Sequence, residues 1–95
     1  MEFERLEFRL HAAERMFERS ISVDDVRQII QSGKVIENYP QDTPYPSCLI
    51  LGNVRGRPLH VVVAKDEVFH RAIVITVYEP DLERWEPGFE RRKSP

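Results

Sequence analysis

The sequence predicts an α+β fold, in which two N-terminal helices pack on one face of a three- to four-stranded antiparallel meander. Two observations support this class. Helical periodicity dominates residues 11–33, and short apolar segments separated by proline and glycine follow from residue 34. Because the helices precede strands that follow one another directly, the order is typical of an α+β domain.

The 95 residues are enough for one small domain with a modest core. No repeat or low-complexity linker divides the chain, so we expect a single domain over residues 1–95. Residues 79–95 contain Pro80, Pro87 and Gly88, which predicts a loosely structured C-terminal tail with a turn near Trp85.

The first predicted helix covers residues 11–20. Ala12, Ala13, Met16 and Phe17 fall on one side at helical spacing, so we expect them to form its apolar face.

The second predicted helix has a clearly marked start and end. Ser22 is a favourable N-cap, and Asp25 occupies the capping-box position three residues later. Asp24 and Asp25 also lie in the first turn, where acidic side chains interact favourably with the helix dipole. Gly33 is a natural C-terminal stop.

Alternation of apolar and polar residues predicts the strands. Residues 6–10 suit a short strand or an extended lead-in. The remaining predicted strands cover 34–39, 48–54, 59–65 and 72–78, with a turn at 55–57.

The faces of the sheet follow from strand parity if both hairpins pair in even register. The odd positions would then form the face against the helices: Leu49, Leu51, Leu59, Val61, Val63, Ile73, Ile75 and Val77. The even face would mix small, polar and apolar groups, with His60 near Gly52 and Thr76. Such a face predicts a shallow platform for a ligand or a partner.

Composition narrows the function classes. The net charge is −2, so a nucleic acid would have to be met by a local cluster of basic residues. One cysteine, Cys48, and three scattered histidines predict neither a disulfide nor a metal site, and we expect no cofactor. Without a long apolar run or a signal-like N-terminus, we expect a cytoplasmic protein that does not enter the membrane.

His11, Arg15 and Arg19 form the first candidate constellation. They recur every four residues, which places them along one side of the first helix. An imidazole beside two guanidinium groups suits phosphate binding and proton transfer. The alternative is a solvated helix face, on which these residues pair with Glu14 and Glu18.

The second constellation joins His60, Thr76 and Tyr78 on the even face to Arg55 and Arg57 in the turn. These residue types could cleave RNA without a metal: a base takes the 2′-hydroxyl proton, an acid protonates the leaving oxygen, and arginine stabilises the phosphorane. The alternative is a locally hydrogen-bonded histidine, an arginine-rich turn and an interfacial tyrosine.

Four stretches together resemble a known family: HAAERMFERSISVDDV, SGKVIENYP, GRPLHVVVA and IVITVYEPD. The signature, an HAxxRMxxRxI helix followed by PLHVVVA and TVYEPD strands, is similar to that of a small bacterial family of domains of unknown function. The resemblance covers roughly residues 9–86. The matching positions are His11, Arg15, Arg19, His60, Thr76, Tyr78 and Pro80.

That family is similar in outline to the BrnT and RelE-like toxins of type II toxin–antitoxin pairs. The resemblance implies a toxin-like fold, RNA-cleaving ability in some relatives and a small antitoxin partner. The acidic balance of this chain departs from strongly basic RelE-like toxins, which favours cleavage of free RNA over ribosome-dependent cleavage.

Two functions follow from these observations. The first is a metal-independent endoribonuclease of a toxin–antitoxin pair. In it, His60 or His11 exchanges protons and Tyr78 orients or donates. The phosphate-binding residues would be Arg15, Arg19, Arg55, Arg57 and Thr76. The second is a non-enzymatic interaction module, a homodimer or partner-binding domain, that uses the exposed sheet face.

Overall fold

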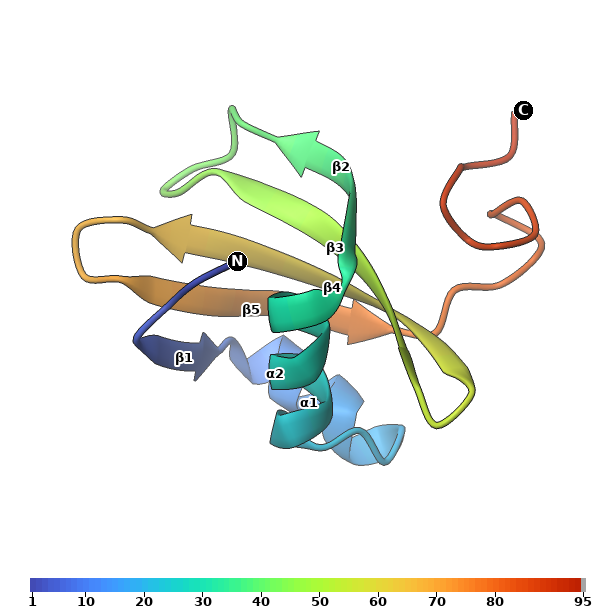
Figure 1. Ribbon diagram of the computed structural model, residues 1–95, viewed down its shortest axis with the longest axis horizontal. Helices are drawn as coiled ribbons and strands as arrows, with labels where there is room; N and C mark the ends of the chain where they lie inside the picture. Colours follow the sequence, from blue (N-terminus) through green and yellow to red (C-terminus); the bar gives the residue numbers. More distant parts are fainter. Residues whose placement is uncertain (95) are drawn as a thin grey trace.

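The structure is a computed structural model that describes residues 1–94 (Figure 1). Within these residues, two helices lie on one face of a mixed five-stranded sheet with the strand order β1-β5-β4-β3-β2. Helix α1 contacts β5, and α2 contacts β3 and β4. The elements are β1 (Arg5–Phe8), α1 (Leu10–Glu18), α2 (Val23–Ser32), β2 (Lys34–Tyr39), β3 (Ser47–Val54), β4 (Arg57–Asp66) and β5 (Arg71–Tyr78).

The α+β class and the helix-covered sheet are confirmed, but the predicted strand number and purely antiparallel pairing are wrong. Strands β2 to β5 form the expected antiparallel meander. The additional strand, β1, pairs parallel with β5, from Arg5 opposite Arg71 to Phe8 opposite Val74. Both helices lie between β1 and the meander in the chain, and such a helical connection is what a parallel pairing requires.

The boundaries of α2 are confirmed in detail. The Ser22 hydroxyl accepts the Asp25 backbone N–H at 3.0 Å, and the Asp25 carboxylate accepts the Ser22 N–H at 3.0 Å. This reciprocal capping box satisfies two N–H groups that the helix itself leaves unpaired. Helix α2 ends at Ser32, directly before Gly33.

The predicted apolar face of α1 is only half correct. Ala12 and Met16 are buried against the sheet, as expected. Phe17, in contrast, is 89% exposed, and Leu10 at the start of the helix is 76% exposed. The buried stripe is therefore narrow, and α1 presents large apolar side chains to solvent.

The register assumed for the β3–β4 hairpin is wrong by one residue. Val54 pairs with Arg57, so the turn contains only Arg55 and Gly56, both with positive φ (51° and 81°). Two such residues form the turn whose twist suits a two-residue hairpin. Because this loop is one residue shorter than expected, odd positions of β3 face even positions of β4.

The two faces of the sheet consequently differ from the prediction. The helix-covered core takes Leu59, Val61, Val63 and Val77 as predicted, but it also takes residues of the other parity: Cys48, Ile50, Ala72 and Val74. A bulge between Val62 and Val63 shifts the pairing with β5. By alternation, Leu49, Leu51 and Ile73 belong to the face opposite the helices.

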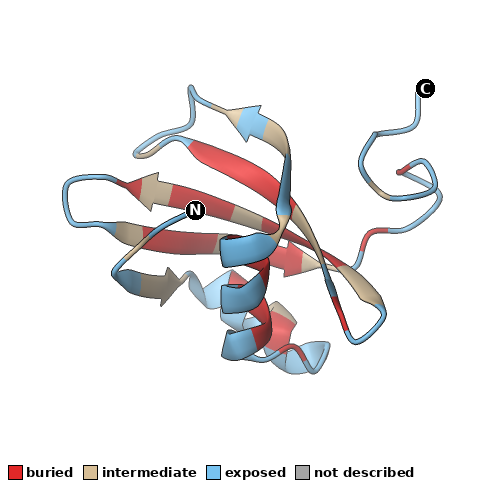
Figure 2. Cartoon of the chain, viewed as in Figure 1, coloured by how far each residue is buried: buried red, intermediate tan, exposed pale blue. Residues whose placement is uncertain are grey.

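That outer face is only partly open, in contrast to the platform that the sequence suggests. Leu49 and His60 are both 0% exposed, and buried residues follow β3, β4 and β5 along most of their length (Figure 2). No helix in the described part of the chain is long and apolar enough to cross a membrane.

Candidate phosphate-binding pocket beside Tyr78

A pocket of about 350 Å³ lies where the end of β5 meets α1 and the start of the tail. We call it the cationic pocket. It brings together Arg15, Arg19, Thr76 and Tyr78, four of the residues that the sequence nominated. Its full lining is Arg15, Arg19, Thr76, Tyr78, Glu79, Pro80, Asp81, Arg84, Trp85 and Arg92.

Helix α1 supplies the arginines that define the charge of this pocket. Ala12 and Met16 pack into the core beneath β5, which fixes the helix beside the strand. Arg15 and Arg19 then follow one another by one turn along the pocket wall. Among residues 1–94 neither guanidinium forms an ion pair.

The other charged groups of the pocket largely neutralise one another. Arg84 binds Asp81 at 2.9 Å, and Arg92 reaches out to Glu37 at 2.8 Å. Glu79 accepts a hydrogen bond from Arg57. The net positive charge of the pocket is therefore carried by Arg15 and Arg19, and the pocket suits an anionic ligand.

The polar wall of the pocket ends in a hydrogen-bonded chain of three residues. Nδ1 of His60 lies 3.1 Å from the hydroxyl of Tyr78, and Nε2 lies 2.8 Å from the carbonyl oxygen of Phe89. A carbonyl only accepts, so Nε2 carries the proton, and in neutral His60 Nδ1 accepts from Tyr78. Thr76, two residues before Tyr78 on β5, adds a hydroxyl to the same wall.

Burial determines the protonation states of His60 and Tyr78. Removal from water lowers the pKa of His60, because the charged imidazolium is the form that burial disfavours. The same effect raises the pKa of Tyr78, which keeps its phenol protonated at neutral pH.

His60 itself is sealed from solvent. The indole of Trp85, 2% exposed, packs edge-on against the imidazole with 4.4 Å between ring centroids. Arg92 in turn lies 4.6 Å above the Trp85 ring. In this arrangement a substrate cannot contact His60. The imidazole lies behind Tyr78 as seen from the pocket.

The tail that forms this cover has no helix among its described residues, as predicted, yet it is packed on the domain. A bridge pairs Trp85 with Arg92, and Lys34 binds Glu90. The bridge closes the tail on itself. The ion pair of Lys34, with that between Glu37 and Arg92 and the contacts of His60, holds the tail against the end of the sheet where β5 stops (Figure 1).

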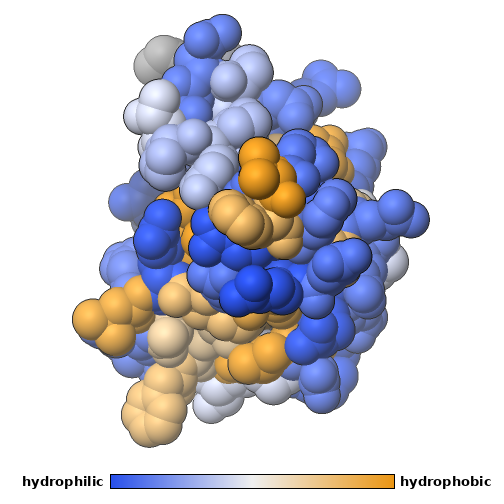
Figure 3. Space-filling view, turned by 90° about the vertical axis from the view of Figure 1, so that its left-hand side faces the viewer, coloured by the Kyte–Doolittle hydropathy of each residue, from blue (hydrophilic) through white to orange (hydrophobic). Residues whose placement is uncertain are grey.

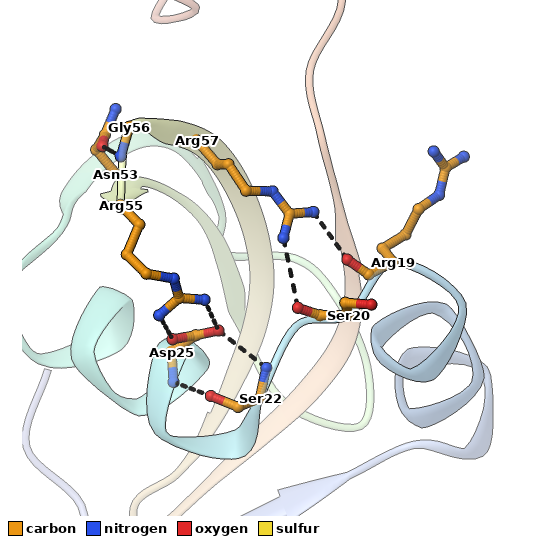
Figure 4. Close-up of polar contacts among 8 residues, drawn as sticks. All are labelled: Arg19, Ser20, Ser22, Asp25, Asn53, Arg55, Gly56 and Arg57. Atoms are coloured by element: carbon orange, nitrogen blue, oxygen red, sulfur yellow. Dashed lines mark hydrogen bonds and ion pairs between the residues drawn. The ribbon is translucent and has the colours of Figure 1, made fainter.

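The predicted phosphate-binding role of Arg55 does not agree with its position. Both of its terminal nitrogens bind the Asp25 carboxylate at 3.0 Å, outside the cationic pocket (Figure 4). The ion pair lowers the pKa of Asp25 to about 2. Arg55 thus reinforces the capping box of α2.

Arg57 is likewise engaged within the protein. It donates to the backbone carbonyls of Arg19 and Ser20, which ties the link between the helices to the start of β4 (Figure 4). The Arg19 guanidinium points away from these contacts in the same view. Arg57 therefore positions the end of α1, and Arg19 keeps its charge for the pocket.

His11 lies apart from the pocket lining. It is exposed on α1, one helical turn before Arg15. The structure therefore brings Arg15, Arg19, Thr76 and Tyr78 together in one pocket. His60 lies behind Tyr78, and His11 lies outside the pocket lining.

Five lining residues were missed by the sequence prediction: Glu79, Asp81, Arg84, Trp85 and Arg92. All belong to the tail, which carries no periodicity. The available signal was its composition, since acidic, basic and aromatic residues follow the last strand at once.

Comparison with known proteins assigns the chain to a family. The profile of DUF4258, a domain of unknown function, matches residues 8–79. The chain belongs to the DUF4258 family. No curated protein and no solved structure matches the chain.

The span matched by DUF4258 contains α1, α2 and the complete meander, including Arg15, Arg19, His60 and Tyr78. It stops one residue before Pro80. The part of the tail that covers His60 therefore lies outside the matched span.

Proposed function

We propose that this DUF4258 protein is a toxin-like, metal-independent endoribonuclease of a type II toxin–antitoxin pair that acts in the cytoplasm. The observation that carries the proposal is the convergence of Arg15, Arg19 and Thr76 on the exposed side of Tyr78. An RNA phosphodiester is an anion that needs charge neutralisation and a proton donor, and this pocket offers both kinds of group.

The phosphate would lie between the two α1 arginines and the Thr76 hydroxyl. Guanidinium groups bind phosphate oxygens through charge-assisted hydrogen bonds, and they stabilise the extra charge of a phosphorane more than that of the ground state. The ion pairs of Arg84 and Arg92 leave these two arginines as the charge available to RNA.

In the proposed reaction, the 2′-hydroxyl oxygen attacks phosphorus while the bond from phosphorus to the 5′-oxygen breaks. His11 takes the 2′-hydroxyl proton. The Tyr78 hydroxyl, which donates to Nδ1 of His60 in the free protein, turns its hydrogen toward the substrate and donates it to the leaving oxygen. The products are a 2′,3′-cyclic phosphate and a 5′-hydroxyl. His60 touches no substrate and acts as a positioning residue, because it holds the Tyr78 hydroxyl at the pocket wall.

His11 is assigned as the base on its position in the helix. It lies four positions before Arg15 on the helix, which corresponds to about 6 Å along the axis. It is the exposed imidazole on the element that carries both phosphate-binding arginines.

The test is cleavage of single-stranded RNA by purified protein in the presence of EDTA. We expect products with cyclic phosphate ends, and a loss of at least about a hundredfold in rate for Tyr78→Phe, His11→Ala and Arg15→Gln. Matched controls are Tyr39→Phe, a half-buried phenol outside the pocket, and Arg27→Gln on α2.

Cleavage that needs a divalent metal, or that survives all three pocket substitutions, would contradict the assignment. If only the His11→Ala variant still cleaves RNA, the assignment of His11 as the base is rejected and the other roles stand. The toxin role is tested separately: expression should arrest growth, and the protein encoded beside the gene should restore it.

A second function is favoured by one specific observation. Leu10 and Phe17 lie two helical turns apart on α1 and are largely exposed, as are Val68 and Phe69 in the β4–β5 turn. Figure 3 views the side that carries this turn, and hydrophobic groups (orange) protrude there between hydrophilic ones (blue). An apolar surface shared by neighbouring residues marks a partner-binding site, and Leu10 and Phe17 lie on the same side of α1.

The alternative is therefore a non-enzymatic interaction module, a homodimer or partner-binding domain, that uses α1. The outer sheet face, which the sequence suggests for this role, contains the buried Leu49 and His60 beside the half-buried Leu51 and Val62. Phe17→Ser should abolish partner binding without unfolding the domain. If Phe17→Ser removes all activity in cells while purified protein never cleaves RNA, the module replaces the nuclease.

A further inference from the structure

A second and larger cavity, of about 660 Å³, shares no lining residue with the cationic pocket. We call it the hairpin cavity. It opens between the C-terminal half of α2, the turn end of the β3–β4 hairpin and Phe89 of the tail. Its lining residues are Gln28, Ile29, Ser32, Gly33, Lys34, Leu51, Gly52, Asn53, Pro58, Gly88 and Phe89.

The chemistry of this cavity suits a neutral, flat molecule. Lys34 is its single ionisable residue, and Glu90 neutralises it in an ion pair. Leu51, Pro58 and Phe89 contribute apolar surface. An uncharged cavity with a few polar groups on apolar walls is the usual form of a small-molecule or ring-binding site.

Two side-chain amides supply the specific polar groups, one from each wall. The Asn53 Oδ1 atom accepts the Gly56 N–H at 3.0 Å, so its NH₂ group is left to donate. Gln28, on an exposed position of α2, offers both a donor and an acceptor. Asparagine and glutamine amides match the paired donor and acceptor on the edge of adenine.

A third observation links this cavity to the cationic pocket. Phe89 lines the hairpin cavity, and its carbonyl is bound by His60, whose other nitrogen is bound by Tyr78 in the cationic pocket. The His60 imidazole therefore bridges Phe89, in the wall of the hairpin cavity, and Tyr78, in the wall of the cationic pocket. RNA-binding proteins commonly pair a basic backbone site with an aromatic surface on which a base stacks.

We propose that the hairpin cavity binds an adenine base of a single-stranded RNA, stacked on Phe89 and hydrogen-bonded to Asn53 and Gln28. The inference rests on the proposed function, because it makes the cavity the base-specificity site of the same RNA substrate. A second anion site is disfavoured, since its single cation already has a partner.

The experiment titrates ¹⁵N-labelled protein with adenosine and, separately, with uridine, and follows backbone amide shifts by NMR. Nucleosides carry no phosphate, so their binding is independent of the cationic pocket. We expect adenosine to shift the amides of Gly52, Asn53 and Phe89, and to bind about tenfold more tightly than uridine.

Two substitutions and one control probe the contacts. Asn53→Asp keeps the oxygen that accepts the Gly56 N–H and removes the amide donor, while Gln28→Ala removes the other amide from an exposed helix site. Each should weaken adenosine binding by about tenfold. Gln31→Ala, on the same helix and outside the cavity, should leave it unchanged.

Absence of adenosine shifts, equal binding of uridine, or an Asn53→Asp variant that binds normally would overturn the inference. RNA cleavage independent of adenine would also overturn it while leaving the nuclease proposal standing. Adenosine binding with no cleavage of any RNA would instead support the base site and reject the nuclease.

Discussion

The hydroxyl of Tyr78 lies 3.1 Å from Nδ1 of His60, on paired positions of β5 and β4. One partner faces the cationic pocket and the other is sealed beneath Trp85. The pair therefore links surface and interior: Tyr78 lines the pocket, and His60 holds the phenol hydroxyl from behind.

This relationship predicts a cost in stability for Tyr78→Phe. The substitution keeps the ring but leaves Nδ1 of a fully buried imidazole without its partner, which should lower the free energy of unfolding by about 1–2 kcal/mol. Urea denaturation measures the loss. Tyr39→Phe is the control, because the partner of its hydroxyl, Glu37, also binds Arg92. Equal stability of Tyr78→Phe and the parent protein would refute the hydrogen bond.

The buried imidazole also predicts a pH dependence. The pKa of His60 is lowered on folding from its usual 6.5, so the unfolded chain takes up a proton at a higher pH than the folded one. Stability is then complete above about pH 6.5 and falls as the pH drops toward the folded-state pKa. Denaturation curves between pH 7.5 and about pH 5 test this. The fall of the unfolding free energy with decreasing pH should be smaller in His60→Gln than in the parent protein, and it should persist in His70→Gln, an exposed site. The same pH dependence in all three proteins would contradict a lowered pKa for His60.

The sequence predicted most elements because their signals are local. Ser22 and Asp25 define the start of α2 over four residues, and a capping box requires no distant partner. The strands of the meander also have local signals, since apolar and polar residues alternate within each strand. Strand β1 was uncertain because four residues carry too little periodicity, and its pairing with β5 joins distant parts of the chain.

The candidate site was predicted less completely than the fold. Arg15 and Arg19 were placed correctly on one side of α1, and Thr76 and Tyr78 lie beside them. Arg55 was misassigned because its acidic partner, Asp25, lies 30 residues away in the sequence. The burial of His60 depends on Trp85 in the tail, a contact that no local pattern indicates.

The capping box and its ion pair predict different roles for two adjacent aspartates. Asp25→Asn should lower the free energy of unfolding by about 1 kcal/mol. The amide oxygen can still accept the Ser22 N–H, but the negative charge in the first turn and one acceptor oxygen for Arg55 are lost; the ion-pair part is small because the Arg55 side chain is largely exposed and screened by solvent. Asp24→Asn, whose side chain is 96% exposed, should change it by less than about 0.5 kcal/mol.

The same aspartate predicts the behaviour of the protein in acid. The pKa of Asp25 is lowered on folding to about 2, so its contribution is fully present above about pH 4 and is lost as the pH falls through 2. Thermal melts from pH 5 to about pH 2 should show a shallower decline for Asp25→Asn than for the parent protein. An identical decline in both would mean that Arg55 and Asp25 do not pair in solution.

The last prediction concerns the tail, which reaches the domain through Trp85 and Arg92. Trp85→Ala removes a buried indole from the surface of His60 and should lower the free energy of unfolding by about 3–5 kcal/mol. Arg92→Gln removes both the ion pair with Glu37 and the cation above the indole, and should cost about 1 kcal/mol. Arg91→Gln, at an exposed neighbouring position whose side chain forms no hydrogen bond or ion pair among the described residues, is the matched control and should change stability little. Since the imidazole would become accessible once the indole leaves, the histidine side-chain signals of Trp85→Ala should titrate closer to the usual histidine pKa in NMR. Retention of the parent stability and of a depressed His60 pKa in Trp85→Ala would mean that the tail does not cover the imidazole in solution.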